Sequence, residues 1–270
     1  MKKLLYILLI ATVLSSCSEY QKALKSTDVT LKYKVGEEKY KEGKFNKANK
    51  LFVQIVPKYR GKPQAQRLMY MYANTFYETR DYYTANYQFE RFVTAYPESE
   101  KVVEAAFLGA KSYYFLSPLY SKEQKETVEA LSKLQNFINT YPDSEYSVEA
   151  NALVRELDYK LEKKAYEIAY QYNKTTPYTR DFQAAISAFD KFLLEYPGSS
   201  FREDAFYYKF DSAYQLAINS VDRKMEDRLN IAIEYYNNLL RAFPQTKYAE
   251  DALEMYEELT ELLQNYNTKS

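Results

Sequence analysis

A short pattern of residues recurs five times along the chain, and this internal repeat restricts the possible folds more than any other feature. Each copy has an alanine followed by bulky apolar residues four and seven positions later. In the last four copies a proline stands twelve positions after the alanine, whereas in the first copy Pro57 comes three residues early. The five alanines are Ala48, Ala85, Ala130, Ala185 and Ala232.

The spacing within each copy predicts pairs of packed helices. Residues at positions i, i+4 and i+7 share one helix face, and a small alanine on that face lets a neighbouring helix approach closely. The proline ends the helix. A serine or threonine two residues later is suited to cap the next helix, and these residues are Ser99, Ser144, Ser199 and Thr246. Because no segment shows the two-residue alternation of a strand, we predict an all-α fold.

These helix pairs resemble tetratricopeptide repeats, which stack on one another and enclose a groove lined by the first helix of each pair. We predict an all-α solenoid of about five tetratricopeptide-like helical hairpins within a domain over residues 29–270. The expected repeats cover residues 29–60, 63–97, 99–142, 144–197 and 199–244, followed by a final helix over 246–266.

The first seventeen residues have the pattern of a lipoprotein export signal. Two lysines precede an eleven-residue apolar run, which is too short to cross a bilayer as a helix because that needs about 20 residues. The run ends in Leu-Ser-Ser-Cys, which resembles a bacterial lipobox, so we predict a signal peptide over 1–16, lipidation of Cys17 and a linker over 17–28. The alternative is an ordinary secretory signal beside which the only cysteine falls by chance.

The composition removes the parts that most catalytic chemistries need. The chain has no His, one Cys and only five Gly. It therefore lacks the residues for a Ser-His-Asp triad, a His or Cys metal site, or a glycine-rich phosphate loop. We expect no catalytic residues, no metal and no cofactor, and thus no enzyme. The 37 basic and 37 acidic residues balance, so nothing favours nucleic acid as a partner.

Tyrosine is abundant, with 31 residues in a chain of 270. Aligning the first helices of repeats one and two matches Tyr33 with Tyr70 and Tyr40 with Tyr77. The two tyrosines within each helix are seven positions apart and so share one helix face. We predict a groove for an extended or β-forming peptide, because tyrosine offers contact area and a hydroxyl group for backbone atoms. The alternative is that these rings fill the seam between helices. The predicted peptide-binding residues are Tyr33, Tyr40, Arg67, Tyr70, Asn74 and Tyr77.

The lipobox at Cys17, the five repeats and the Tyr-Pro-x-Ser motifs that begin at Tyr96, Tyr141 and Tyr196 resemble the BamD (ComL-type) lipoprotein family of the outer-membrane β-barrel assembly machinery. The resemblance implies a lipid-anchored scaffold on the outer membrane of a Gram-negative bacterium, facing the periplasm. It also implies N-terminal repeats that contact unfolded outer-membrane protein clients. The C-terminal repeats would bind the barrel-forming, BamA-like subunit.

Two other classes of lipoprotein are alternatives to this resemblance. A periplasmic tetratricopeptide adaptor for cell division or peptidoglycan maintenance would be expected to carry a coiled-coil trimerisation segment, which this sequence lacks. A SusD-like glycan-binding lipoprotein would be a much longer chain with Trp platforms, whereas this chain has no Trp.

Overall fold

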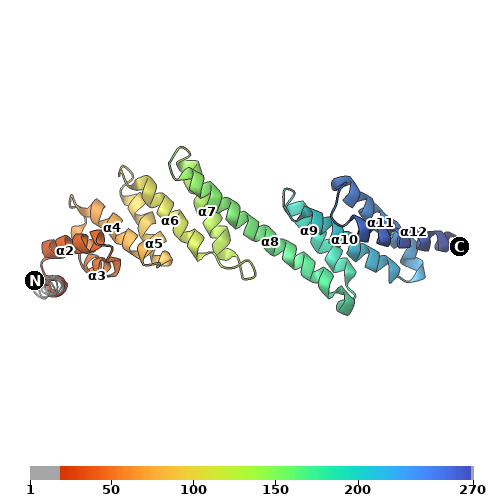
Figure 1. Ribbon diagram of the computed structural model, residues 1–270. Coiled ribbons are helices and arrows are strands. Elements are labelled where there is room, and N and C mark those ends of the chain that lie inside the picture. The colour runs from red at the N-terminus through yellow and green to blue at the C-terminus, as the bar shows by residue number, and fades with distance from the viewer. Residues whose placement is uncertain (1–18, 269–270) are drawn as a thin grey trace, which may run out of the picture. The chain divides into compact units, whose positions relative to one another are not determined.

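A computed structural model describes residues 19–268 of the chain (Figure 1). All regular elements within this range are helices, which confirms the predicted all-α class. The predicted signal peptide and Cys17 lie outside the described residues.

In the described residues, a helical segment over 19–25 precedes five hairpins and a final helix. This segment lies within the predicted linker, but it packs Tyr20 and Ala23 against Val35 of the first hairpin. The first three hairpins are α2 with α3, α4 with α5, and α6 with α7, and they are followed by α8 with α9 and α10 with α11. A short 3-10 helix, η1, extends the first hairpin. The bounds are α2 Val29–Lys41, α3 Phe45–Ile55, η1 Val56–Tyr59, α4 Ala65–Glu78, α5 Tyr82–Ala95, α6 Val102–Leu116, α7 Lys125–Thr140, α8 Ser147–Thr179, α9 Phe182–Glu195, α10 Arg202–Ile218, α11 Asp222–Ala242 and α12 Ala249–Asn267.

Two hairpin turns one hundred residues apart are built in the same way. Arg80 follows the C-cap of α4 and Arg180 follows α8, and both adopt left-handed backbone with φ of 63° and 55°. An aspartate follows each arginine and caps the next helix, since Asp81 accepts a hydrogen bond from the Thr84 amide and Asp181 accepts one from the Ala184 amide. The local sequence therefore specifies both turns.

The repeat prolines end their helices as predicted, but the serine and threonine caps differ from the expectation. Helices α5, α7, α9 and α11 each end two residues before the proline, because the residue before a proline avoids helical backbone. The Ser99 hydroxyl accepts from the Lys101 amide, in a turn that precedes the start of α6 at Val102. Ser199 and Thr246 make the same bond to the amide two residues on. These side chains thus shape the turn rather than cap the helix.

The helices group into two compact units. Unit 1 holds the described residues up to Pro118 together with Glu123–Leu157, and unit 2 holds Leu119–Lys122 and the residues from Asp158 onward. Helix α8 contributes its first turns to unit 1 and the remainder to unit 2.

The core of unit 1 forms where paired helices approach at small residues. Ala85 has no exposed surface, and Phe89 and Phe92 on the same face of α5 are also fully buried. A Cβ atom at Gly36 would lie 2.6 Å from Cε1 of the buried Phe52, so only glycine fits the contact between α2 and α3. Close helix contact thus depends on the small residues.

The core of unit 2 repeats this arrangement. Ala185 is fully buried, and Phe189 and Phe192 on the same face of α9 are 0% and 2% exposed. The final helix α12 closes the unit by burying Ala252 and Leu259 against α10 and α11. The alanine frame read from the sequence therefore marks the packed face of the helices in both units.

Replacing Ala85 by leucine should test this packing. Three additional carbon atoms at a fully buried contact force neighbouring side chains out of their rotamers, so we expect a loss of about 1–3 kcal/mol in the free energy of unfolding. Urea denaturation followed by circular dichroism measures the change. Ala95→Leu, at the exposed end of the same helix, is the control and should unfold like the parent; equal stability of the two variants would contradict the packing described above.

Candidate peptide-binding cleft

A cleft of about 900 Å³ opens in unit 1 among the first helices of its three hairpins. Helices α2, α4 and α6 supply its walls, and the turn between α5 and α6 closes one side. Both aromatic rings and charges of either sign reach its surface. The lining residues are Tyr40, Lys41, Pro63, Gln66, Arg67, Tyr70, Met71, Phe92, Glu98, Ser99, Glu100, Lys101 and Glu104.

Three of the six predicted peptide-binding residues, Tyr40, Arg67 and Tyr70, line this cleft. The other three lie elsewhere. Asn74 is buried behind the cleft, where its Oδ1 accepts a 2.7 Å hydrogen bond from the Tyr40 hydroxyl. The amide thus fixes the orientation of the Tyr40 ring without forming part of the surface.

Tyr33 and Tyr77, the other members of the two matched pairs, pack between helices. Tyr33 stacks on Tyr59 with ring centroids 5.4 Å apart. Tyr77 contacts Tyr82 and Phe115 edge-on, at centroid distances of 5.7 Å and 6.1 Å. Residues seven apart share a helix face, but the two ends of one helix meet different neighbours. The predicted four-tyrosine ladder is therefore not a single surface.

Burial holds the cleft tyrosines in their neutral form. Burial, together with the charges of Glu78 and Glu104, raises the pKa of Tyr40 to about 12. The pKa of Tyr70 rises further, through burial and then through its hydrogen bond to Glu104. Both hydroxyl groups therefore remain hydrogen-bond donors at any physiological pH.

Glu104 and Lys101 form the charged part of the wall beside Tyr70. The Lys101 Nζ atom lies 2.7 Å from Glu104 Oε2 and 5.6 Å from the centroid of the Tyr70 ring. Burial opposes ionisation of Glu104, but hydrogen bonds from Lys101 and Tyr70 outweigh it and lower the pKa of this carboxyl group. Neither residue was predicted, because the order of α4 and α6 in space brings them to Tyr70 from more than thirty positions away.

Arg67 places a largely exposed cation at the rim of the cleft. Its guanidinium pairs with Glu37, which also accepts from Lys41 at 3.0 Å, yet the Arg67 side chain is 61% exposed. The cation side of this pair is exposed and Glu37 keeps Lys41 as a second partner, so a ligand carboxylate can take the place of Glu37 at Arg67 without leaving Glu37 unpaired. The cleft can therefore offer flat aromatic contact, neutral hydroxyl oxygens that can accept hydrogen bonds, and an exchangeable cation, which suits an extended peptide.

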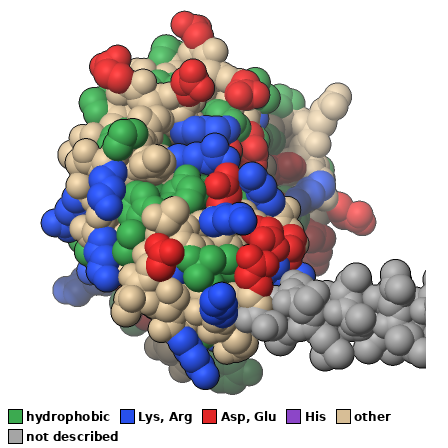
Figure 2. All heavy atoms as spheres, turned by 90° about the vertical axis from the view of Figure 1, so that its left-hand side faces the viewer, with side chains coloured by type: hydrophobic (Ala, Val, Ile, Leu, Met, Phe, Trp, Pro, Cys, Tyr) green, Lys and Arg blue, Asp and Glu red, His purple; other side chains and the backbone are tan. Residues whose placement is uncertain are grey.

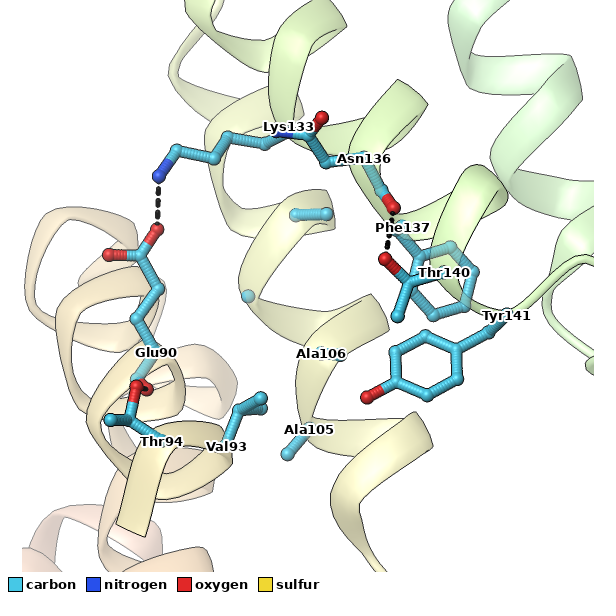
Figure 3. Close-up of a pocket in the computed structure, with 12 residues that line it drawn as sticks. Glu90, Val93, Thr94, Ala105, Ala106, Lys133, Asn136, Phe137, Thr140 and Tyr141 are labelled. Carbon is cyan, nitrogen blue, oxygen red and sulfur yellow. Dashed lines mark hydrogen bonds and ion pairs between the residues drawn. The ribbon is translucent and has the colours of Figure 1, made fainter. Parts of the chain in front are cut away.

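A second, smaller cleft of about 380 Å³ lies between α5 and α7 over the surface of α6 (Figure 3). Ala105, Ala106 and neighbouring small residues of α6 form its apolar floor. Glu90 and Lys133 face each other across it and form a 2.6 Å ion pair, as Figure 3 shows. The Tyr113 hydroxyl donates to the same carboxylate at 3.2 Å. This ion pair ties α5 to α7.

Charges of both signs are distributed over the end of unit 1 that carries α2 and α3. Figure 2 shows Lys and Arg side chains next to Asp and Glu side chains, with hydrophobic side chains between them. In residues 19–268 no group of three or more acidic, His or Cys side chains could hold a metal ion. The helices in the same range are all too short or too polar to cross a membrane.

Comparison with protein families shows what kind of chain this is. The family model described as YfiO, outer membrane lipoprotein, matches residues 25–180 and 178–269. The chain belongs to this family. It is also 29% identical over 238 residues to the putative outer membrane protein assembly factor BamD of Aquifex aeolicus (strain VF5), covering 86% of this chain and 76% of that protein. The resemblance to BamD-type lipoproteins is confirmed, and it is favoured over the adaptor and SusD-like alternatives.

Two solved structures are less similar to this chain in sequence identity than the Aquifex aeolicus protein is. The TPR2AB-domain:pHSP90 complex of yeast Sti1 aligns over 86% of this chain and 98% of that chain, with 13% identity and a TM-score of 0.40. A computationally designed self-assembling cyclic homo-oligomer aligns over 100% and 98%, with 12% identity and a TM-score of 0.18. The family assignment thus depends on the sequence matches.

Alkaline pH should destabilise the fold through the buried tyrosines. The pKa of Tyr40 is about 12 in the folded chain and 10.0 without the fold, so its contribution to stability is complete below pH 10 and is lost as pH rises toward 12. We expect the urea midpoint to fall steadily across this range. Tyr40→Phe should show a shallower fall, and identical pH profiles for parent and variant would contradict the burial of this hydroxyl.

Proposed function

We propose that the chain is a non-catalytic scaffold of the outer-membrane β-barrel assembly machinery. Its unit 1 cleft would bind segments of unfolded outer-membrane proteins, and its C-terminal repeats would bind the barrel-forming, BamA-like subunit. The observation that carries the proposal is the cleft that joins Tyr40, Tyr70 and Arg67, in a chain of the outer-membrane lipoprotein family.

The chemistry of the cleft matches that of a membrane β-strand before it is inserted. Such strands alternate apolar and polar side chains, and their backbone groups have no partners until the barrel closes. The rings of Tyr40 and Tyr70 can pack against the apolar side chains. Their hydroxyl protons are already donated to Asn74 and Glu104, so the hydroxyl oxygens can accept hydrogen bonds from backbone N–H groups. Arg67 and Lys101 can pair with acidic groups. Because aromatic faces and exchangeable charges do not require one particular side chain, the cleft could bind clients of many different sequences.

The end of unit 2 suits a folded partner. Helix α12 is the last helix of the repeats, and its buried residues Ala252 and Leu259 are covered by α10 and α11. On a flank of the helix, about 100° around from Ala252, Leu253 is 46% exposed and stands among glutamates. An amphipathic helix with an apolar residue on its free side is a usual docking element for another protein.

Attachment to the membrane would come from Cys17. The residue lies outside the described range, so this part of the proposal depends on the lipobox sequence and on the family. More than one acyl chain is needed for stable attachment, and a diacyl anchor would hold the repeats at the periplasmic face of the outer membrane.

The cleft and α12 should be separable by substitution. Arg67→Ala combined with Tyr70→Phe removes the rim cation and one hydroxyl but keeps the ring. We expect binding of a fluorescent peptide with alternating apolar and polar residues to weaken by about tenfold or more, equivalent to about 1.4 kcal/mol. Co-purification with the barrel-forming subunit should be unchanged. Leu253→Asp should reduce co-purification with the barrel-forming subunit and leave peptide binding unchanged.

Arg155→Ala is the matched control, because this arginine is exposed on the part of α8 that belongs to unit 1 and lies outside the cleft. It should bind the peptide like the parent, with fluorescence anisotropy as the measurement. If the cleft variant and this control bind equally well, the cleft is not the client site. If the cleft variant and Leu253→Asp each lose both peptide binding and co-purification, the two interactions do not reside in separate units.

Cys17→Ala should detach the protein from the membrane. The repeats fold without the anchor, so the helical content should be unchanged while the chain remains unprocessed or becomes soluble. Fractionation after a high-salt wash measures the effect. Retention of the variant in the outer membrane at the level of the parent would show that another element holds it there.

A further inference from the structure

A polar pocket of about 360 Å³ lies within unit 2, apart from the cleft proposed for clients. It is formed by the last turns of α8 and α10 and by the start of α9. We call it the Asp211 pocket. Its lining residues are Asn173, Lys174, Thr176, Pro177, Arg180, Phe182, Asp211, Gln215 and Asn219.

The carboxylate of Asp211 stands inside this pocket without a basic partner. Asn173 Nδ2 donates to Asp211 Oδ2 at 2.6 Å and to Ser212 Oγ at 3.0 Å. Burial raises the pKa of Asp211, although hydrogen bonds from Asn173 and Gln215 act in the opposite direction. Within residues 19–268 no lysine or arginine forms an ion pair with this carboxylate. Asp211 is partly buried, and a partly buried carboxyl group held by amides alone has a lower stabilising effect when it is ionised than one with a cationic partner.

Two of the three helix ends at the pocket add to its negative potential, while the third, the start of α9, is a positive end that Asp181 caps. Helix α8 ends at Thr179 and α10 ends at Ile218, and residues from the last turns of both helices line the space. The carboxyl-terminal end of a helix carries a partial negative charge that favours a cation nearby. The Asn219 side chain, beside the end of α10, offers a further amide.

Unit 1 shows that the hairpin does not need such a pocket. One hundred positions earlier, at the counterparts of Pro177, Phe182 and Gln215, stand Tyr77, Tyr82 and Phe115. Their rings pack together, and Tyr82 stacks on Phe115 with centroids 4.5 Å apart. The counterpart of Asp211 is Lys111, which pairs with Glu149 at 2.6 Å. Thus an aromatic cluster fills the space in one unit, whereas the other keeps it open around an acid.

We propose that the Asp211 pocket receives a basic side chain, an arginine or lysine, from a partner protein. A guanidinium group carries five N–H donors, which can be shared between a carboxylate and the oxygens of nearby amides such as Gln215 and Asn219. The group would supply the missing counter-charge to Asp211. This inference is independent of client binding in unit 1.

Two cations, Lys174 and Arg180, also line the pocket, so an acidic ligand is the alternative that the experiment must exclude. Lys174 is directed back along α8, with its Nζ atom 5.2 Å from the centroid of the Tyr170 ring. Arg180 stands on the exposed hairpin turn. An acidic ligand would bind through these two residues and be repelled by Asp211, whereas a basic ligand would bind through Asp211 and be repelled by them.

Titration of the full chain with Nα-acetyl-arginine amide tests the proposal, with the neutral isostere Nα-acetyl-citrulline amide as the control probe. Side-chain amide signals of Asn173 and Gln215 in isotope-labelled protein report binding by nuclear magnetic resonance. We expect saturable shifts with the arginine compound only. Asp211→Asn should abolish the shifts, while Arg180→Ala should preserve or enlarge them.

Gln215→Phe provides a second variant that keeps Asp211. It introduces the residue found at the matching position of unit 1 and fills the pocket, so it should also abolish binding. Circular dichroism of both pocket variants checks that they fold. Equal shifts with arginine and citrulline, no shifts with either, or loss of binding in Arg180→Ala but not in Asp211→Asn would overturn the proposal.

Discussion

The structure depends on close contact between paired helices at small residues. Ala85 and Ala185 have no exposed surface, and the phenylalanines four positions later fill the space beside them completely. A helix that carries a larger residue at this point would stand further from its partner, and the aromatic rings would no longer meet. All other features of both units, including the clefts, are set by the helix positions that result.

Residues that do not take part in the alanine contacts between helices give the clefts of the two units different charges and polarity. Arg67 places a cation at the unit 1 cleft, while the residue one hundred positions later is Glu167. Phe115 closes the end of a hairpin in unit 1, whereas Gln215 leaves the corresponding site open. Because these positions do not contribute to the alanine contacts, they can change without loss of the fold. One scaffold can therefore carry an aromatic cleft in unit 1 and a polar pocket in unit 2.

Tyrosine is suited to both roles that it has in this chain. Tyr77 and Tyr207 pack between helices, where Tyr207 stacks on Tyr248 at a centroid distance of 3.8 Å. Tyr40 and Tyr70 pack along one side of the ring and present the remainder to the cleft. A ring with a polar end can bury most of its surface and still keep a hydrogen-bonding group at the boundary. Tyrosine therefore suits positions such as Tyr40 and Tyr70, where the packed helix faces border a cleft.

The helices, their proline-marked ends and their buried faces could be predicted from the sequence, because alanine spacing and proline act within a few residues. The helix starts were predicted less well, since Asp81 and Asp181 cap their helices while the serines and threonines expected as caps shape the preceding turns. The lipobox and the repeat motifs likewise identified the family. The composition of the sites could not be predicted, since it depends on which helices meet. Glu104 reaches Tyr70 from the next hairpin, and Asp211 meets Asn173 across two helices. Tyr77 shares a helix face with Tyr70 but packs on Phe115, because tertiary contacts differ along one helix.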